Sequence, residues 1–277
     1  MPYLKIGSEK NEDILLSYAD YGEGRAVILI HGWPLSHRMW EKQIGFLVDN
    51  GFRVIAYDRR GFGESYKPWN GYNYDTFAND LAMLIDALQL SDVSLVGFSM
   101  GGGEVARYIG RHGTGKLSKV VLMSSVTPYL KKTSDNPNGV DQSVFDGMLA
   151  GLRKDRPGFL EQFCRQFYNW DADGKELMSE AAFRHSWDIA VWANPKATLD
   201  CVTAFSATDF REDLKKFDVP TLVMHGSADA IVPFEVSGKL AHEMLPGSKL
   251  ELIEGGAHGL TATRPDDVNK ALLGFLK

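Results

Sequence analysis

A serine that lies between glycines, directly after an apolar run, constrains this chain more than any other feature. Residues 97–101 (Gly-Phe-Ser-Met-Gly) follow the strand-like residues 93–96 and precede a stretch with helical spacing. The flanking glycines allow neighbouring backbone to approach without a Cβ clash. The pattern predicts a sharp strand-to-helix turn that holds the Ser99 hydroxyl at the carboxyl edge of a sheet.

Short strand-like runs alternate with helical spacing along much of the chain. Eight strands are expected, at residues 3–7, 15–21, 26–30, 53–57, 93–97, 119–123, 220–224 and 249–253, the first two antiparallel. Continuous apolar runs among them are typical of strands buried on both faces. Asp75 is expected to cap a helix between the fourth and fifth strands, and Gly113 to end the helix after Ser99. The alternation predicts an α/β fold with a mostly parallel sheet flanked by helices.

The alternation stops in the middle of the chain. Residues 127–213 contain a polar turn at 135–139, followed by helical stretches rich in aromatic side chains. We expect these residues to form a helical cap inserted into a core made of residues 1–126 and 214–277. A single aromatic at helical spacing is more typical of packing. A cap over an active site is nevertheless expected to lend some of its aromatics to an apolar pocket.

Composition argues against several classes of partner. The 277 residues carry a net charge of −6, so no basic field is expected to attract nucleic acid or anionic lipid. No apolar stretch approaches the length of a membrane span, and the first residues do not resemble a signal peptide. A soluble cytoplasmic protein is expected. Cys164 and Cys201 lie in apolar, aromatic-rich surroundings that favour buried free thiols over a disulfide.

Two further residues complete a set of three that suits nucleophilic catalysis. A serine hydroxyl needs a base to take its proton and a third group to orient that base. Asp229 follows the expected strand at 220–224, and His258 follows the strand at 249–253. The carboxyl ends of parallel strands meet at one edge of the sheet, so Ser99, Asp229 and His258 are expected to converge there. Asp218 precedes its strand and would lie at the opposite edge.

Five motifs give the chain a wider resemblance. They are residues 31–36 (His-Gly-Trp-Pro-Leu-Ser), 58–63 (Asp-Arg-Arg-Gly-Phe-Gly), 74–77 (Tyr-Asp-Thr-Phe), 97–113 and 255–258 (Gly-Gly-Ala-His). With these motifs the chain resembles the α/β-hydrolase family, and within it the cofactor-free bacterial haloperoxidases, which are similar to aryl esterases and perhydrolases. The resemblance implies an α/β-hydrolase fold whose sheet has eight strands, and it weakens in the cap.

The resemblance also implies roles for individual residues. Ser99, Asp229 and His258 would form a catalytic triad, and the backbone amides of Trp33 and Met100 an oxyanion hole. The physical setting agrees, because Met100 begins the helix after the serine, where free amides and the helix dipole favour negative charge.

Other residues near these motifs are expected to line the substrate pocket or to support the structure around it. Pro34, Phe98, Ile231 and Leu260 are candidates for the substrate pocket. We expect His31 to brace the loop that carries the oxyanion donor. The pair Arg59 and Arg60 is more typical of structural ion pairs than of an anion receptor.

The leading hypothesis is a serine carboxylic-ester hydrolase that acts on small or aryl esters through an acyl enzyme. Perhydrolysis is the main alternative, in which hydrogen peroxide replaces water; the resemblance implies it and Pro34 is the local feature that supports it. A lactonase or lactamase would use the same triad, whereas dehalogenases and epoxide hydrolases need a carboxylate in place of Ser99. A non-catalytic receptor would usually lack a triad member. No cofactor or metal is implied, and a homo-oligomer is compatible with the resemblance.

Overall fold

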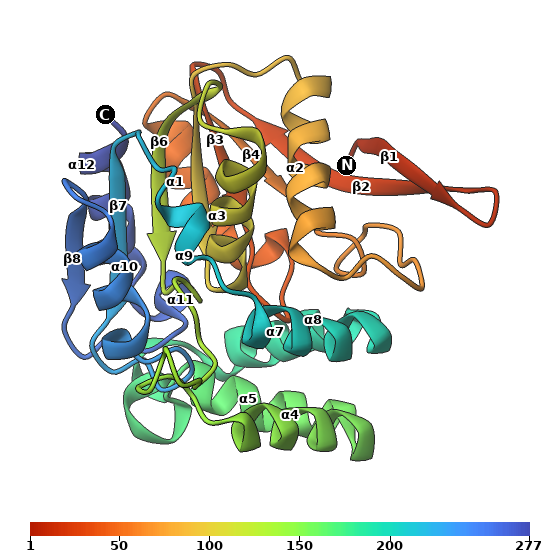
Figure 1. Ribbon diagram of the computed structural model, residues 1–277, viewed down its shortest axis with the longest axis vertical. Helices are drawn as coiled ribbons and strands as arrows, with labels where there is room; N and C mark the ends of the chain where they lie inside the picture. Colours follow the sequence, from red (N-terminus) through yellow and green to blue (C-terminus); the bar gives the residue numbers. More distant parts are fainter.

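An eight-stranded sheet runs through the centre of the structure (Figure 1). The computed structural model describes residues 1–277. Its strands are β1 (Tyr3–Glu9), β2 (Glu12–Tyr21), β3 (Arg25–Ile30), β4 (Phe52–Tyr57), β5 (Val93–Phe98), β6 (Leu117–Met123), β7 (Thr221–Gly226) and β8 (Lys249–Ile253). They lie in the order β1-β2-β4-β3-β5-β6-β7-β8; β2 is antiparallel to β1 and β4, and all other neighbours are parallel. The predicted mostly parallel sheet is confirmed.

Helices cover both faces of this sheet. Those of the core are η1 (His37–Trp40), α1 (Glu41–Asp49), α2 (Tyr74–Ala87), α3 (Met100–His112), α9 (Arg211–Leu214), η3 (Phe234–Val236), α10 (Gly238–Met244), α11 (Leu260–Thr263) and α12 (Pro265–Leu276). Helices α2, α3 and α9 contact one another in series on the face nearer the viewer in Figure 1, and α1 packs against α12 on the other. All residues of β5 are buried as a result, which explains why its residues are mostly apolar.

The ends of two helices test the sequence-based capping predictions. Asn73, not Asp75, caps α2: its backbone is extended and its side-chain oxygen accepts from the Thr76 amide at 3.0 Å. Asp75 lies in the first turn, where its negative charge interacts favourably with the helix dipole. Its carboxylate also pairs with Arg107 at 2.5 Å. The prediction for Asp75 was therefore wrong by two residues. Helix α3 ends at Gly113, in the left-handed region at φ 73°, as predicted.

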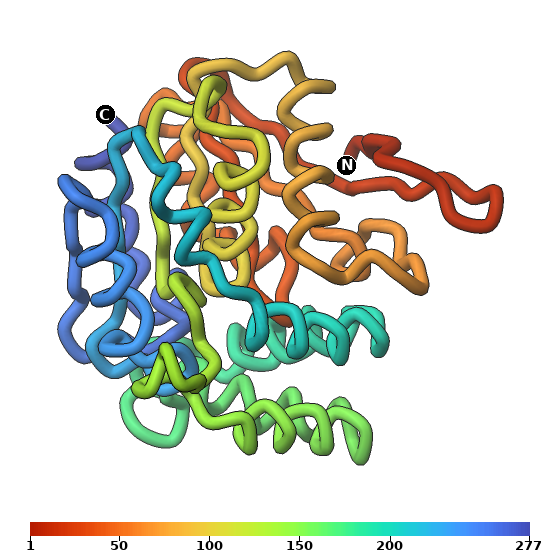
Figure 2. Tube along the Cα trace, in the orientation of Figure 1, coloured from red at the N-terminus to blue at the C-terminus, as the bar shows by residue number.

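The segment between β6 and β7 forms a helical layer across one end of the strands. It contains α4 (Gln142–Lys154), α5 (Arg156–Phe167), η2 (Trp170–Gly174), α6 (Lys175–Leu177), α7 (Glu180–Trp192) and α8 (Pro195–Ala207). Figure 2 shows the trace leaving the lower end of β6, passing through these helices and returning upward to β7. Since β6 is parallel to its neighbours, the layer lies at the carboxyl ends of the strands. We call this layer, α4 to α8, the cap.

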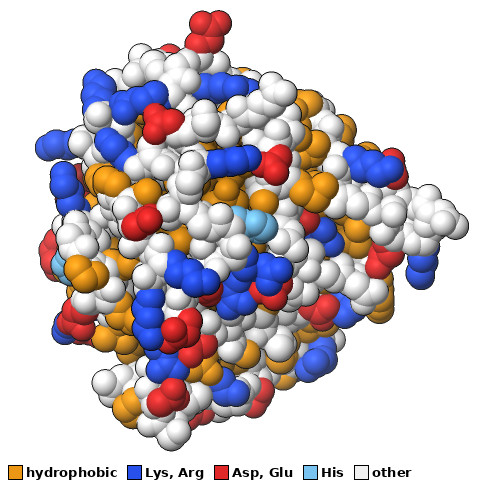
Figure 3. All heavy atoms as spheres, turned by 45° about the horizontal axis from the view of Figure 1, so that its top comes forward, with side chains coloured by type: hydrophobic (Ala, Val, Ile, Leu, Met, Phe, Trp, Pro, Cys, Tyr) orange, Lys and Arg blue, Asp and Glu red, His pale blue; other side chains and the backbone are white.

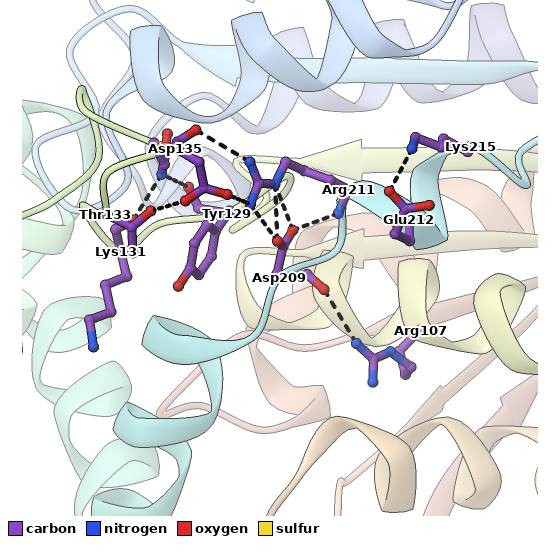
Figure 4. Close-up of polar contacts among 10 residues, drawn as sticks. Arg107, Tyr129, Lys131, Thr133, Asp135, Asp209, Arg211, Glu212 and Lys215 are labelled. Atoms are coloured by element: carbon purple, nitrogen blue, oxygen red, sulfur yellow. Dashed lines mark hydrogen bonds and ion pairs between the residues drawn. The ribbon is translucent and has the colours of Figure 1, made fainter.

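One arginine ties together the two segments that connect the cap to the core (Figure 4). Arg211 lies after the cap and pairs with Asp135, before the cap, at 2.6 Å and with its neighbour Asp209 at 2.6 Å. Its guanidinium also lies over the Tyr129 ring, 5.4 Å from the centroid. The Thr133 hydroxyl and Arg211 lower the pKa of Asp135 to about 2, so its carboxylate is charged at neutral pH. The entry and exit of the cap are thereby held side by side.

Surface charges of both signs are intermingled. On the face shown in Figure 3, Lys and Arg side chains lie beside Asp and Glu side chains rather than in one basic field. No helix combines the length and the apolar character needed to span a bilayer. Cys164 and Cys201 are buried free thiols, and burial raises the pKa of Cys164 to about 12.

Candidate active site

Ser99 lies between β5 and α3 in a strained backbone conformation, with φ 54° and ψ −118°. Non-glycine residues seldom adopt positive φ, and such strain clusters at functional sites. The neighbouring glycines make the turn sterically feasible. A Cβ on Gly97 would lie 2.5 Å from the Gly101 carbonyl oxygen, and one on Gly101 would overlap the Ile30 carbonyl. The predicted sharp turn is therefore present.

His258 lies between Ser99 and Asp229. Its Nε2 atom is 3.0 Å from Ser99 Oγ, and its Nδ1 atom is 2.6 Å from Asp229 Oδ2. The three side chains come from the segments that follow β8, β5 and β7, and all three residues are buried. The carboxylate can only accept, so the ring proton lies on Nδ1 and leaves Nε2 free to accept the serine proton. The structure brings together the three residues predicted to converge.

Asp229 is held by a dense set of donors. Its Oδ1 atom accepts from the amides of Ile231 at 2.9 Å and Val232 at 2.8 Å, and His225 Nε2 lies 3.3 Å from Oδ2. Burial acts to raise the pKa of Asp229, but the charge of His258 and the hydrogen bonds from both histidines outweigh it and hold the pKa well below its usual range. The carboxylate therefore stays ionised beside the imidazole.

Two backbone segments border the serine hydroxyl. A Cβ on Gly32 would lie 3.0 Å from Ser99 Cβ, so the loop after β3 runs directly against the nucleophile. Trp33 is the next residue in that loop, and Met100 is the first residue of α3. The amides predicted to form an oxyanion hole thus lie on the two segments that flank Ser99.

Aromatic rings from core and cap enclose this site. The imidazole of His258 packs against Phe167 of the cap, with ring centroids 4.8 Å apart, and against Phe98 of β5 at 4.9 Å. The Trp33 ring lies 4.9 Å from Phe163 of the cap, and its indole N–H donates to a carbonyl of α8 at 3.1 Å. With Phe98 and Phe167 packed against it, the His258 side chain is fully buried.

A cavity of about 300 Å³ opens onto Ser99. Thirteen of its 17 lining residues are hydrophobic, and none is charged. The cap contributes many of them, including Val144, Phe145 and Met148 of α4 and Phe159 of α5. The cavity therefore suits an uncharged, largely apolar group beside the nucleophile.

Only part of the predicted pocket lines this cavity. Ile231 does, but Pro34, Phe98 and Leu260 do not. Phe98 is fully buried against the His258 imidazole, Leu260 is fully buried at the start of α11, and Pro34 is buried in the turn after Trp33. These three predictions were wrong because the cap, rather than the core loops, supplies most of the cavity wall.

Two polar residues of the cavity escaped the sequence analysis. Gln162 and Gln166 of α5 are, apart from Ser99, the only lining residues with polar side chains. Their spacing of four residues places them on one face of the helix, which is the signal that could have found them. Both are exposed at the cavity mouth. No group of three or more His, Cys, Asp or Glu side chains is arranged to hold a metal ion.

The arginine pair behaves as predicted. Arg59 pairs with Glu104 at 2.6 Å, and Arg60 pairs with Asp80 at 2.6 Å. Both pairs are buried, with the carboxylates on α3 and α2. The predicted bracing by His31 is also present, because its ring contacts the Arg59 amide at 3.0 Å.

Comparison with known proteins agrees with this geometry. The family described as the alpha/beta hydrolase fold matches residues 25–265. The solved structure of a bromoperoxidase from Bacillus anthracis is 52% identical, with a TM-score of 0.95 over 99% of both chains. A non-heme chloroperoxidase of Kitasatospora aureofaciens is 43% identical over 96% of this chain and 97% of its own. A bifunctional esterase/perhydrolase of Acinetobacter calcoaceticus is 40% identical over 94% and 95%, respectively.

The family match covers most of the chain and includes all the residues brought together around Ser99. The relatives are similar along nearly their whole length, so the likeness extends beyond the shared sheet to the cap. The chain is an enzyme that belongs to the α/β-hydrolase family, in the branch whose members are named non-heme haloperoxidases and esterase/perhydrolases.

Proposed function

We propose that this enzyme hydrolyses small or aryl carboxylic esters through an acyl enzyme on Ser99. The observation that carries the proposal is the continuous hydrogen-bonded series from Ser99 through His258 to Asp229, with Ser99 itself lining an uncharged, apolar cavity. A nucleophile, a base and an ionised orienting group are the parts that acyl transfer requires.

The reaction proceeds in two steps. Ser99 Oγ attacks the ester carbonyl while His258 Nε2 takes its proton, and the amides of Trp33 and Met100 donate to the oxyanion. His258 then protonates the departing alkoxide, which leaves the acyl group on Ser99. Water then attacks the acyl carbon while His258 takes its proton, and His258 returns that proton to Ser99 Oγ as the bond to the acyl group breaks and the carboxylic acid leaves. Asp229, kept ionised, stabilises the imidazolium in both steps.

The cavity favours short, neutral acyl or aryl groups. Its volume of about 300 Å³ is at the lower end of ligand pockets. It contains no charged side chain that would offset the desolvation of a charged substrate. Long acyl chains would have to extend past the mouth into solvent.

A panel of p-nitrophenyl esters from acetyl to dodecanoyl, together with one lactone and one amide, tests this proposal. We expect kcat/KM to be highest for acetyl or butyryl esters. A rate that rises steadily to decanoyl and beyond would point to a lipase-like groove. Turnover of the lactone or amide with no ester hydrolysis would overturn the proposal.

Perhydrolysis is a second candidate, favoured by the names of the relatives and by Pro34 beside the oxyanion donor. Hydrogen peroxide would replace water at the acyl enzyme and leave as a peracid. The free peracid would oxidise bromide to hypobromous acid and return to the carboxylic acid. Proline restricts the backbone of the preceding Trp33, whose carbonyl would accept a hydrogen bond from peroxide.

Bromination of an indicator in acetate, peroxide and bromide tests this second candidate. We expect it to require the carboxylic acid, to survive chelators and to disappear in Ser99→Ala. Pro34→Leu should lower the ratio of perhydrolysis to hydrolysis. Bromination that persists in Ser99→Ala would overturn the peracid route, and an unchanged ratio in Pro34→Leu would remove the role of the proline.

A further inference from the structure

We propose that Glu104 and Arg59 are positioning residues that fix the oxyanion hole by joining the two segments that carry its donors. The inference rests on the proposed function, because it assigns the donors to Trp33 and Met100. Neither Glu104 nor Arg59 hydrogen-bonds with the triad, and both are buried.

The first half of the connection starts on the helix of the nucleophile. Glu104 lies four residues after Met100 on α3, so the two residues are one helical turn apart. Glu104 is fully buried, and its Oε2 atom accepts from Arg59 Nε at 2.6 Å. Its other oxygen accepts from the Tyr57 hydroxyl at the end of β4. The carboxylate thus ties α3 to the end of β4 and to the segment after it.

The second half leads from Arg59 to the oxyanion loop. Arg59 Nη2 donates to the His31 carbonyl at 2.9 Å, and the Arg59 backbone amide donates to His31 Nε2 at 3.0 Å. His31 Nδ1 in turn donates to the Gly32 carbonyl at 2.9 Å. The chain of contacts ends one residue before Trp33. Arg59 therefore holds the loop by both its backbone and its side chain.

The chemistry of His31 agrees with this arrangement. Because Nε2 accepts a hydrogen bond, the ring proton lies on Nδ1 and is directed at Gly32. Burial first, and then the nearby charge of Arg59, lower the pKa of His31 to about 3. The ring is therefore neutral throughout the working pH range, and its donor and acceptor keep these assignments.

A role in positioning explains why charged groups are buried here. A buried ion pair gains little net stability over apolar groups of similar size, because both charges lose their hydration. Yet Glu104 and Arg59 sit among the fully buried residues, with Arg59 over the Phe77 ring at 5.3 Å. What apolar groups could not provide is the directional bond from Arg59 to the His31 carbonyl. That bond sets the distance between the two donor segments.

The expected signature is weaker stabilisation of the transition state with unchanged binding of the neutral ester. Donors that are displaced weaken binding of the oxyanion but not of the neutral ester, so kcat falls while KM changes little. Removal of one donor outright typically costs about 10²- to 10³-fold. Loosening the Glu104–Arg59 connection between α3 and the oxyanion loop should therefore lower kcat by at least about tenfold.

Two variants test the proposal. Arg59→Met combined with Glu104→Met removes both charges without leaving either unpaired. Arg59→Lys keeps the charge but cannot contact Glu104 and the His31 carbonyl as a guanidinium does. The matched control is Arg60→Met combined with Asp80→Met, which removes the neighbouring buried pair, bonded at 2.6 and 2.7 Å but with no contact to His31.

The readouts are kcat and KM for p-nitrophenyl acetate and the affinity for an aryl trifluoromethyl ketone, followed by fluorine NMR. The ketone forms a tetrahedral oxyanion on the serine, whereas phenol, whose affinity is the second binding readout, has no carbonyl to attack and forms no oxyanion. In both test variants we expect kcat and ketone affinity to fall by at least about tenfold, with KM and phenol affinity within about twofold. The control pair should leave all four values within about twofold.

Other results are equally informative. If either folded test variant keeps wild-type kcat and ketone affinity, or if the control pair loses as much, the positioning role is wrong. If the double variant does not fold, Arg59→Lys decides the question. If the wild type hydrolyses no ester, the proposed function fails. Ketone affinity still tests the positioning role of Glu104 and Arg59, because ketone binding requires no turnover.

Discussion

The backbone amide of Gly259 donates to the carbonyl of Phe167 at 2.8 Å. Gly259 directly follows His258, and Phe167 is the last residue of α5, so this bond ties the loop of the catalytic base to the cap. The two segments approach so closely that a Cβ on Gly259 would overlap the ring of Tyr168. Cap position and imidazole position are therefore mechanically coupled.

Gly259→Ala should consequently impair catalysis without touching a catalytic atom. The added methyl must push the Tyr168 ring or the His258 loop outward, and the distance from Nε2 to Ser99 Oγ increases. We expect kcat to fall by about tenfold or more, since small displacements of a catalytic group are costly. Steady-state kinetics measure the effect, with Gly274→Ala as the control because its Cβ would meet nothing within 4 Å. Equal kinetics in the two variants would show that the coupling does not matter.

The two glutamines at the cavity mouth should select substrates with a neutral hydrogen-bonding group. We predict that Gln162→Leu combined with Gln166→Leu lowers kcat/KM for hydroxyl-bearing esters by about fivefold relative to their methyl isosteres. A fivefold change corresponds to the net free energy of about one hydrogen bond. Paired esters with the hydroxyl at successive acyl positions measure this ratio. Gln142→Leu, on the solvent-exposed start of α4, is the control. An unchanged ratio at every position would leave the glutamines without a role in selection.

His31 should make folding stability depend on pH below about 6.5. Its pKa is about 3 in the folded enzyme, against 6.5 for a free histidine, so the unfolded chain binds the proton more readily. The stability from the neutral ring is fully present above pH 6.5 and is lost as the pH falls toward 3.

The magnitude of this loss is at most about 1.4 kcal/mol per pH unit for one proton. Urea unfolding of the wild type and of His31→Asn between pH 7.5 and 4.5 measures it. We expect the difference in free energy of unfolding between them to shrink with falling pH. A difference that stays constant over this range would contradict the assignment.

Ser99 and His258 should act as one unit. Once the serine is gone, the imidazole has no proton to accept, so His258→Ala adds little to the loss already caused by Ser99→Ala. We predict that kcat for the double variant lies close to that of either single variant. Multiplicative losses in the same ester assay would indicate separate roles.

The sequence predicted the sheet and the convergence on Ser99 because both depend on strong local signals. Apolar runs mark the buried strands, and the parallel arrangement then places Asp229 and His258 at the edge where Ser99 lies. The Asp75 prediction failed because Asn73 and Asp75 are both good capping residues two positions apart, and only the backbone conformation at Asn73 decides between them.

The cavity wall could not be predicted in the same way. It depends on how α4 and α5 pack over the sheet, and helical spacing shows which face of a helix is apolar but not what that face meets. Pro34, Phe98 and Leu260 are close in sequence to catalytic residues, yet all three are buried away from the cavity. The Glu104 pairing was also hidden, since a glutamate after three glycines gives no sign of burial.

The ester-hydrolysis rate of Ser99→Ala tests the central claim most directly. Alanine fits the turn, so circular dichroism should match that of the wild type, while the covalent step is lost. We predict that kcat/KM for p-nitrophenyl acetate falls by at least about 10³-fold. A folded Ser99→Ala variant that retains near-wild-type kcat/KM would contradict the assignment of Ser99 as the nucleophile.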